Sequence, residues 1–236
     1  MTLQQPPGHG SAFERSGTLA SAIVAVAVVW TVIQWLVVLA TPSAVRTHQE
    51  AIASRTPVSE VFTTYDLLGI ALFITGIAAF ALTGLWLAAA RRNADRIAPE
   101  QQRRSSVWVW LGWVVPIVSL WFPKQVVDDV WRSTVRDLAQ PSTGWWWGTW
   151  ISAQLLGGLA AQAFGFTGEP RAGFLEYLVL IEGLTALLTT AAVLQWIRVV
   201  RTVSQAQDEL ANAAPSGWGR QPEHPDNYGY SSDYPG

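Results

Sequence analysis

Two adjacent carboxylates, Asp128 and Asp129, come closer to a catalytic arrangement than any other pattern in the sequence. Paired carboxylates can share a proton and act as general acid and general base. Arg132 follows at the three- and four-residue spacings that bring opposite charges together on one helix face. We favour the more ordinary role of ion pairing on the solvated face of an interfacial helix, with Trp131 buried and Arg132 near lipid phosphates.

A single acidic residue, Glu182, stands inside a long apolar segment, about 12 Å from its outer end at 1.5 Å per residue. An ionised side chain at that depth costs several kcal/mol unless it is paired, which makes it a functional candidate. Polar residues in other apolar segments could join it in a cluster: Gln34, Gln154 and Gln162. The cluster would either bind a proton or ligand, as in a small transporter or channel, or hold helices together through a protonated glutamic acid. We favour the second interpretation.

Metal and cofactor chemistry have little support. The chain has no cysteine, and its three histidines, His9, His48 and His224, are far apart and outside the apolar segments. No phosphate-binding glycine loop, zinc-protease motif or nucleophile elbow occurs. The net charge of −2 gives no basic face for nucleic acid. We therefore expect no metal, no cofactor, no nucleic-acid partner and no enzymatic activity.

Composition predicts an all-α integral membrane protein. Half of the 236 residues are hydrophobic and only 14% are charged, against about a quarter in soluble domains. Apolar segments of about twenty residues can cross the hydrocarbon core of a bilayer, and we expect a membrane domain at 17–203 with four transmembrane helices at 17–40, 65–90, 144–166 and 174–197. A flexible leader (1–16) and a disordered tail (204–236) would flank it. Pro42 is expected to end the first helix.

The segment 107–122 decides the topology. It is short for a full span and contains Pro116 near its middle, and an amphipathic helix at 124–140 follows it. If it crosses the membrane, lysines and arginines divide almost evenly between the two sides. If it enters and leaves on one side, as a re-entrant or interfacial hairpin, only Arg46, Arg55 and Arg171 remain opposite. The positive-inside rule favours the hairpin, with both termini cytoplasmic in the plasma membrane.

The same arrangement would bring many tryptophans near the cytoplasmic interface, where indole rings are enriched. These are Trp86, Trp108, Trp110, Trp131, Trp145, Trp146, Trp147 and Trp196.

Small and basic residues indicate possible contacts of this domain. Ala153, Gly157, Ala161 and Gly165 form a ridge of small residues that would admit a neighbouring helix, within the chain in preference to a second copy. In the second span, Gly69, Gly76 and Gly84 would likewise permit close helix contact. A basic cluster precedes the hairpin and would either bind anionic headgroups or only set the topology: Arg91, Arg92, Arg96, Arg103 and Arg104.

The hairpin and the helix after it resemble a membrane family seen mainly in actinobacteria, the domain of unknown function 4328. The resemblance rests on the spacing of prolines, tryptophans and charged residues: Trp113, Pro116, Trp121, Pro123, Asp128, Asp129, Trp131 and Arg132. Gly144 and Trp145–Trp147, farther along the chain, also fit this family. It would cover about residues 19–203, with Ser119 where the family is expected to have asparagine. It implies the membrane architecture and transfers no catalytic residue.

These observations favour a non-enzymatic membrane module that binds lipid, another membrane protein or itself. A small transporter using the cluster around Glu182, and a membrane-embedded enzyme using Asp128 and Asp129, are the alternatives.

Overall fold

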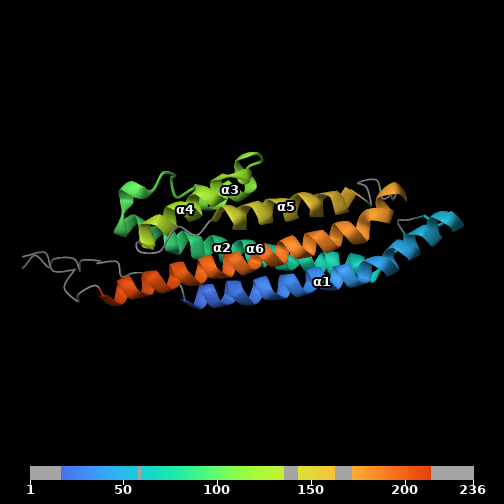
Figure 1. Cartoon of the computed structure of the whole chain (residues 1–236), viewed down its shortest axis with the longest axis horizontal. Helices are drawn as coiled ribbons and strands as arrows, with labels where there is room; N and C mark the ends of the chain where they lie inside the picture. The colour runs from blue at the N-terminus through green and yellow to red at the C-terminus, as the bar shows by residue number, and fades with distance from the viewer. Residues whose placement is uncertain (1–16, 58–59, 136–142, 163–171, 214–236) are drawn as a thin grey trace, which may run out of the picture.

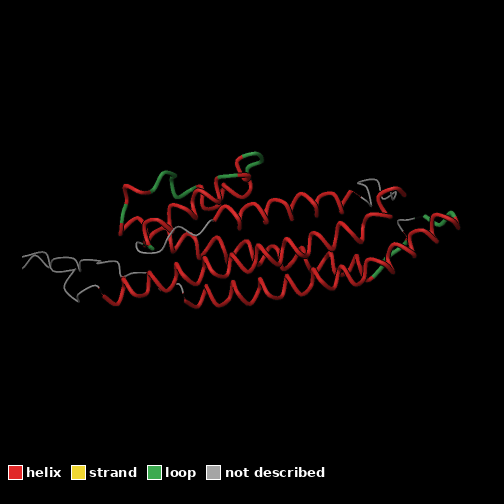
Figure 2. Tube along the Cα trace, in the orientation of Figure 1, coloured by secondary structure: helices red, strands yellow, loops and turns green. Residues whose placement is uncertain are grey.

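A computed structural model describes residues 17–57, 60–135, 143–162 and 172–213, and all regular structure within these ranges is helical (Figure 2). The α-helices are α1 (Gly17–Ser54), α2 (Thr64–Ile97), α3 (Trp108–Val114), α4 (Phe122–Thr134), α5 (Thr143–Gln162) and α6 (Ala172–Ala213). Two short 3-10 helices, η2 (Pro99–Gln101) and η3 (Val118–Leu120), flank α3.

Three of these helices, α1, α2 and α6, are long and apolar enough to cross a membrane. The four long helices lie alongside one another, with α1 packed against both α2 and α6, and α5 packed against α6 (Figure 1). Within the described residues, α2 and α5 share no extended contact. The bundle is therefore open between those two helices.

The start of α1 and the end of α6 meet at one end of the bundle. A Cβ placed on Gly17 would lie 3.9 Å from the Asp208 carboxylate. The segment α3–η3–α4 lies against the same half of the bundle (Figure 1). Its position rests on an apolar core that joins α4 to the C-terminal parts of α2 and α6, made up of Leu87, Ala90, Ala94, Val126, Val127, Val130, Val199, Val200 and Val203.

Tryptophans contribute much of this core. Among the residues expected at the membrane interface, Trp86, Trp131, Trp146, Trp147 and Trp196 are at most 8% exposed. Trp145, by contrast, is 72% exposed. Aromatic packing between helices therefore accounts for five of these eight indole rings.

The expectation that Pro42 ends the first helix is wrong. Helix α1 continues to Ser54, and it bends in its last third (Figure 1). Proline removes one backbone donor, but packing compensates, because Ala44, His48 and Ala51 beyond it are buried. Val45 also packs against Leu175 and Leu178 at the start of α6.

Two further boundaries differ from prediction. Helix α4 ends at Thr134, short of the expected 140; residues 136–140 lie outside the described ranges. Helix α6 runs to Ala213, so residues 204–213 of the expected disordered tail are helical. Burial explains the extension, because Val203, Ser204 and Gln207 all face the bundle.

The turn between α3 and η3 contains a strained residue. Ile117 has φ 65°, in the left-handed region that β-branched residues rarely occupy. Pro116 precedes it and cannot donate a backbone hydrogen bond. The side chains around this turn are apolar and exposed, with Val114 at 67%, Ile117 at 70% and Leu120 at 46%.

Candidate functional site

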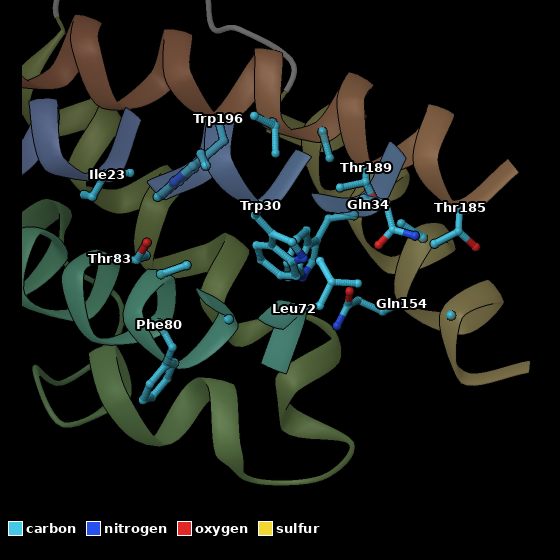
Figure 3. A pocket seen from close by; sticks show the side chains of 18 of the residues that line it. Ile23, Trp30, Gln34, Leu72, Phe80, Thr83, Gln154, Thr185, Thr189 and Trp196 are labelled. Carbon is cyan, nitrogen blue, oxygen red and sulfur yellow. The ribbon is translucent and has the colours of Figure 1, made fainter. Parts of the chain in front are cut away.

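The four long helices enclose a groove of about 720 Å³, shown in Figure 3. It lies where α2 and α5 separate, and α3 contributes Trp113 to its wall. Small side chains leave room for this groove, because Ala27, Gly76, Ala79 and Gly157 are among the residues that line it. The volume lies within the range of small-molecule sites in proteins, about 300–1,000 Å³.

Indole rings form much of the groove wall: Trp30, Trp113, Trp146, Trp150 and Trp196. They support one another in edge-to-face or stacked pairs. Trp30 and Trp150 lie edge to face with centroids 5.5 Å apart, and Trp146 stacks on Trp196 at 4.7 Å. Such pairs fix ring positions with about 0.5–1.5 kcal/mol each beyond their buried area. The aromatic wall is therefore built into the fold.

Polar side chains gather in one part of the groove beside Trp30, where Figure 3 shows Gln34, Gln154, Thr185 and Thr189. Thr185 donates to the Ile181 carbonyl of its own helix at 2.8 Å. The Gln154 side chain, by contrast, is exposed at the groove and forms no hydrogen bond with any described residue. Its two donors and one acceptor are open to the groove.

Gln34 links this groove to the buried Glu182. The Gln34 Nε2 donates to Glu182 Oε2 at 3.1 Å, and the Tyr65 hydroxyl donates to Glu182 Oε1 at 2.6 Å. The Glu182 side chain is 5% exposed, so both of its oxygens are paired inside the protein. Helices α1, α2 and α6 are thereby joined at one point.

The expected polar cluster is only partly assembled. Gln34 contacts Glu182 and Gln154 lines the same groove, whereas the side chain of Gln162 lies outside what the structure describes. Sequence reasoning missed Tyr65. The sequence does contain a hint of this contact. Tyr65 begins the second apolar segment, and with four spans this end lies on the same side of the membrane as Glu182.

The two adjacent carboxylates have separate partners. Asp128 pairs with Lys124 Nζ at 2.6 Å and accepts a hydrogen bond from Thr143. Asp129 accepts from the backbone N–H of Arg103 at 3.0 Å and from its Nε at 2.9 Å, and it also pairs with Arg132.

The expectation that both carboxylates lie on a solvated face is therefore wrong for Asp129, whose side chain is fully buried. The helix folds over the bundle, and the backbone and side chain of Arg103 cover its acidic residue. Asp128 pairs with Lys124 one turn earlier instead of Arg132 one turn later.

The basic cluster also binds the protein itself. Arg91 is 4% exposed, pairs with Asp95 at 2.9 Å and donates to the Arg104 carbonyl at 2.6 Å. Arg104 lies 4.2 Å from the centre of the Phe122 ring and donates to Gln125. Arg96 donates to Asn93 at 3.1 Å, and Arg92 has an interaction of its own. These arginines hold the loop before α3 to α2 and α4.

The remaining motif residues shape the hairpin. Pro123 is buried in the first turn of α4, Trp131 is buried in the core, and Trp121 is 42% exposed. The Trp147 indole donates to the Leu120 carbonyl at 2.6 Å, which ties α5 to η3. Of the motif residues, Trp113 also lines the groove.

The predicted ridge of small residues lies partly along α6. Ala153 is 2% exposed, and a Cβ on Gly157 would lie 3.9 Å from Thr185. Ala161 is exposed, and Gly165 is outside the described residues.

Comparison with known proteins gives one match. The sequence profile of a domain of unknown function (DUF4328) matches residues 54–205. Residues 19–53, which the resemblance was expected to include, precede the matched range. No curated protein and no solved structure matches the chain.

Proposed function

This chain belongs to the DUF4328 family, and because that family has no assigned activity, we propose a function from the chain's own site: a non-enzymatic, multi-pass membrane protein that binds a lipid in the groove between α2 and α5. The observation that carries the proposal is the groove itself, about 720 Å³ in volume and walled by five tryptophans. An apolar ligand dissolved in the bilayer can enter it sideways without passing through water.

The proposal includes a topology of four spans, α1, α2, α5 and α6, with residues 107–122 entering and leaving on the cytoplasmic side. It is supported by the closeness of Gly17 to Asp208, which brings the ends of the described chain together. The exposed apolar turn around Ile117 favours contact with hydrocarbon, and the arginines that precede α3 in the chain favour the cytoplasmic face. Backbone groups at membrane depth must be paired. Residues 118–121 of this turn donate their backbone N–H groups to carbonyls within it, and the Leu120 carbonyl accepts from the Trp147 indole.

Cysteine accessibility tests that topology, because the chain has no cysteine of its own. We expect Glu100→Cys and Gln205→Cys to react with a membrane-impermeant maleimide only from the cytoplasmic face. Glu50→Cys, at the other end of α1, should react only from outside. Labelling of Glu100→Cys and Gln205→Cys from opposite faces would contradict the hairpin.

Lipid binding is tested by filling the groove. A Cβ on Gly76 meets nothing within 4 Å and Gly76 lines the groove, so we expect a phenylalanine there to occupy the ligand's space. Gly69, on the same helix, also has open space but does not line the groove. Native mass spectrometry should show a co-purified lipid with the wild type and Gly69→Phe, and loss of it with Gly76→Phe. Equal lipid retention by both variants would refute the proposal.

A small transporter is the second candidate, and the link between the groove and Glu182 through Gln34 favours it. In that case flux into proteoliposomes should fall with Glu182→Gln. If the wild type and Glu182→Gln both bind lipid equally and neither supports flux, the transporter is excluded and lipid binding remains the proposed function.

A further inference from the structure

We propose that the groove binds an isoprenoid quinone, with the flat ring among the tryptophans and one ring carbonyl accepting a hydrogen bond from Gln154. The inference rests on the proposed function, because it specifies which class of lipid the groove selects. Its evidence is the combination of an unpaired amide, an aromatic wall and a lateral opening in one cavity.

The unpaired amide limits the chemistry of the ligand. Gln154 is eleven residues into α5, about 16 Å from the helix start at 1.5 Å per residue. In the proposed topology this is near the middle of a hydrocarbon layer of about 30 Å. Glycerophospholipid headgroups and esters lie at the interface, too far from this amide. A ligand that pairs with Gln154 must therefore carry its hydrogen-bonding group deep in the bilayer.

The type of group follows from what the cavity offers. The Gln154 amide presents two N–H donors, and an amide left unpaired in an apolar medium is costly. A saturated hydrocarbon chain would fill the space but leave these donors unpaired. A ring carbonyl accepts from an amide without carrying a charge, so the ligand remains soluble in the membrane.

The aromatic wall favours a planar ring. Trp30 lies centrally in the groove in Figure 3, close to Gln34 and Gln154. Its partner Trp150 holds it edge to face at 5.5 Å, so one indole surface is fixed beside the cavity. Offset stacking and edge contacts with a flat ring exceed the contribution of apolar area alone. A quinone ring presents such a face, whereas an acyl chain does not.

The opening between α2 and α5 accommodates the tail. Leu72 and Phe73 line the groove on α2, and Phe73 is 70% exposed. Because α2 and α5 share no extended contact in the described chain, an unsaturated isoprenoid chain can leave the groove between them and continue into the bilayer. Gln34 remains engaged with Glu182, so the ligand needs only one new hydrogen bond.

The test is quenching of tryptophan fluorescence in the full-length protein reconstituted in nanodiscs. The probe is a short-chain isoprenoid naphthoquinone, compared with a phosphatidylcholine brominated on its acyl chains. We expect saturable quenching by the quinone at one equivalent, loss of that saturation with Gly76→Phe, and about tenfold weaker binding with Gln154→Leu, the effect of one lost hydrogen bond. Gln154→Met, which keeps the side-chain length, should weaken binding equally. Gln195→Leu, whose amide bonds to Ala191 of its own helix, is the control.

Each result separates the two proposals. Gly76-dependent quenching by the brominated lipid, without saturable quenching by the quinone, would overturn the quinone and leave lipid binding intact. No difference between Gly76→Phe and wild type with either probe would overturn both. Saturable quinone binding that survives Gln154→Leu and Gln154→Met would overturn the assigned contact and with it this inference.

Discussion

Gly84 gives the sharpest test of how the hairpin sits on the bundle. It faces the Trp110 ring so closely that a Cβ on Gly84 would come within 3.0 Å of Cζ3, Cη2 and Cε3 of that ring. Trp110 is also held edge to face by Phe80, with centroids 6.0 Å apart. The substitution Gly84→Ala must therefore push the indole away from α2. The hairpin that carries it moves too, unless the ring alone turns aside.

The magnitude follows from three contributions. Overpacking by one methyl group costs about 1–3 kcal/mol. Loss of the Phe80–Trp110 pair costs about 0.5–1.5 kcal/mol. The gain in helix propensity from glycine to alanine offsets about 0.8–1 kcal/mol of this. We therefore expect Gly84→Ala to lower the free energy of unfolding by about 1–3 kcal/mol.

The matched control is Gly69→Ala on the same helix, where an added Cβ meets nothing within 4 Å. It should be neutral or stabilising by up to about 1 kcal/mol. Both are measured by denaturant unfolding in mixed micelles. In a Trp110→Ala background, Gly84→Ala should no longer destabilise the protein, because the obstructing ring is gone. Equal stability of Gly84→Ala and Gly69→Ala would refute the packing of α3 on α2.

Three other predictions concern buried polar contacts, each measured by the same unfolding assay. Asp129→Asn should cost about 3 kcal/mol, because a fully buried carboxylate loses its charge beside two guanidinium groups. Asp128→Asn should cost about 1 kcal/mol, because the Asp128 side chain is 18% exposed and that of its partner Lys124 is 30% exposed. Tyr65→Phe removes the hydroxyl that donates to Glu182 and should cost about 1 kcal/mol. Gln207→Leu should cost about 3 kcal/mol, because it removes three buried hydrogen bonds, to Asn93, the Ala90 carbonyl and Thr134.

Each of these has an outcome that would contradict it. Equal losses for Asp129→Asn and Asp128→Asn would show that the burial of Asp129 does not matter energetically. The exposed Tyr177 provides the control for Tyr65. Equal effects of Tyr65→Phe and Tyr177→Phe would show that the contact with Glu182 does not contribute to stability. A Gln207→Leu variant more stable than wild type would place the end of α6 away from α2.

Local chemistry allowed part of this fold to be predicted. Hydropathy indicated helices long enough to cross a membrane, and α1, α2 and α6 have that length and composition. The spacing of Asp129 and Arg132 predicted their ion pair, which forms. The pattern of prolines, tryptophans and acidic residues identified the family. These signals are all contained within single helices or short segments.

Features that depend on packing between helices were missed. Pro42 does not end α1, because burial of Ala44 and His48 outweighs a lost hydrogen bond. Asp129 is buried because Arg103, far earlier in the sequence, lies over it. The groove depends on the separation of α2 and α5, and the residue pattern within either helix does not predict this separation.

Helix α6 runs without interruption through 42 residues, about 63 Å at 1.5 Å per residue. This is about twice the thickness of a hydrocarbon layer. The helix contributes Thr189 to the groove and, farther along, Gln207 to a contact with Asn93 of α2. Because both contacts lie on one continuous helix, a displacement of α6 at Thr189 would also move Gln207, about 27 Å farther along at 1.5 Å per residue.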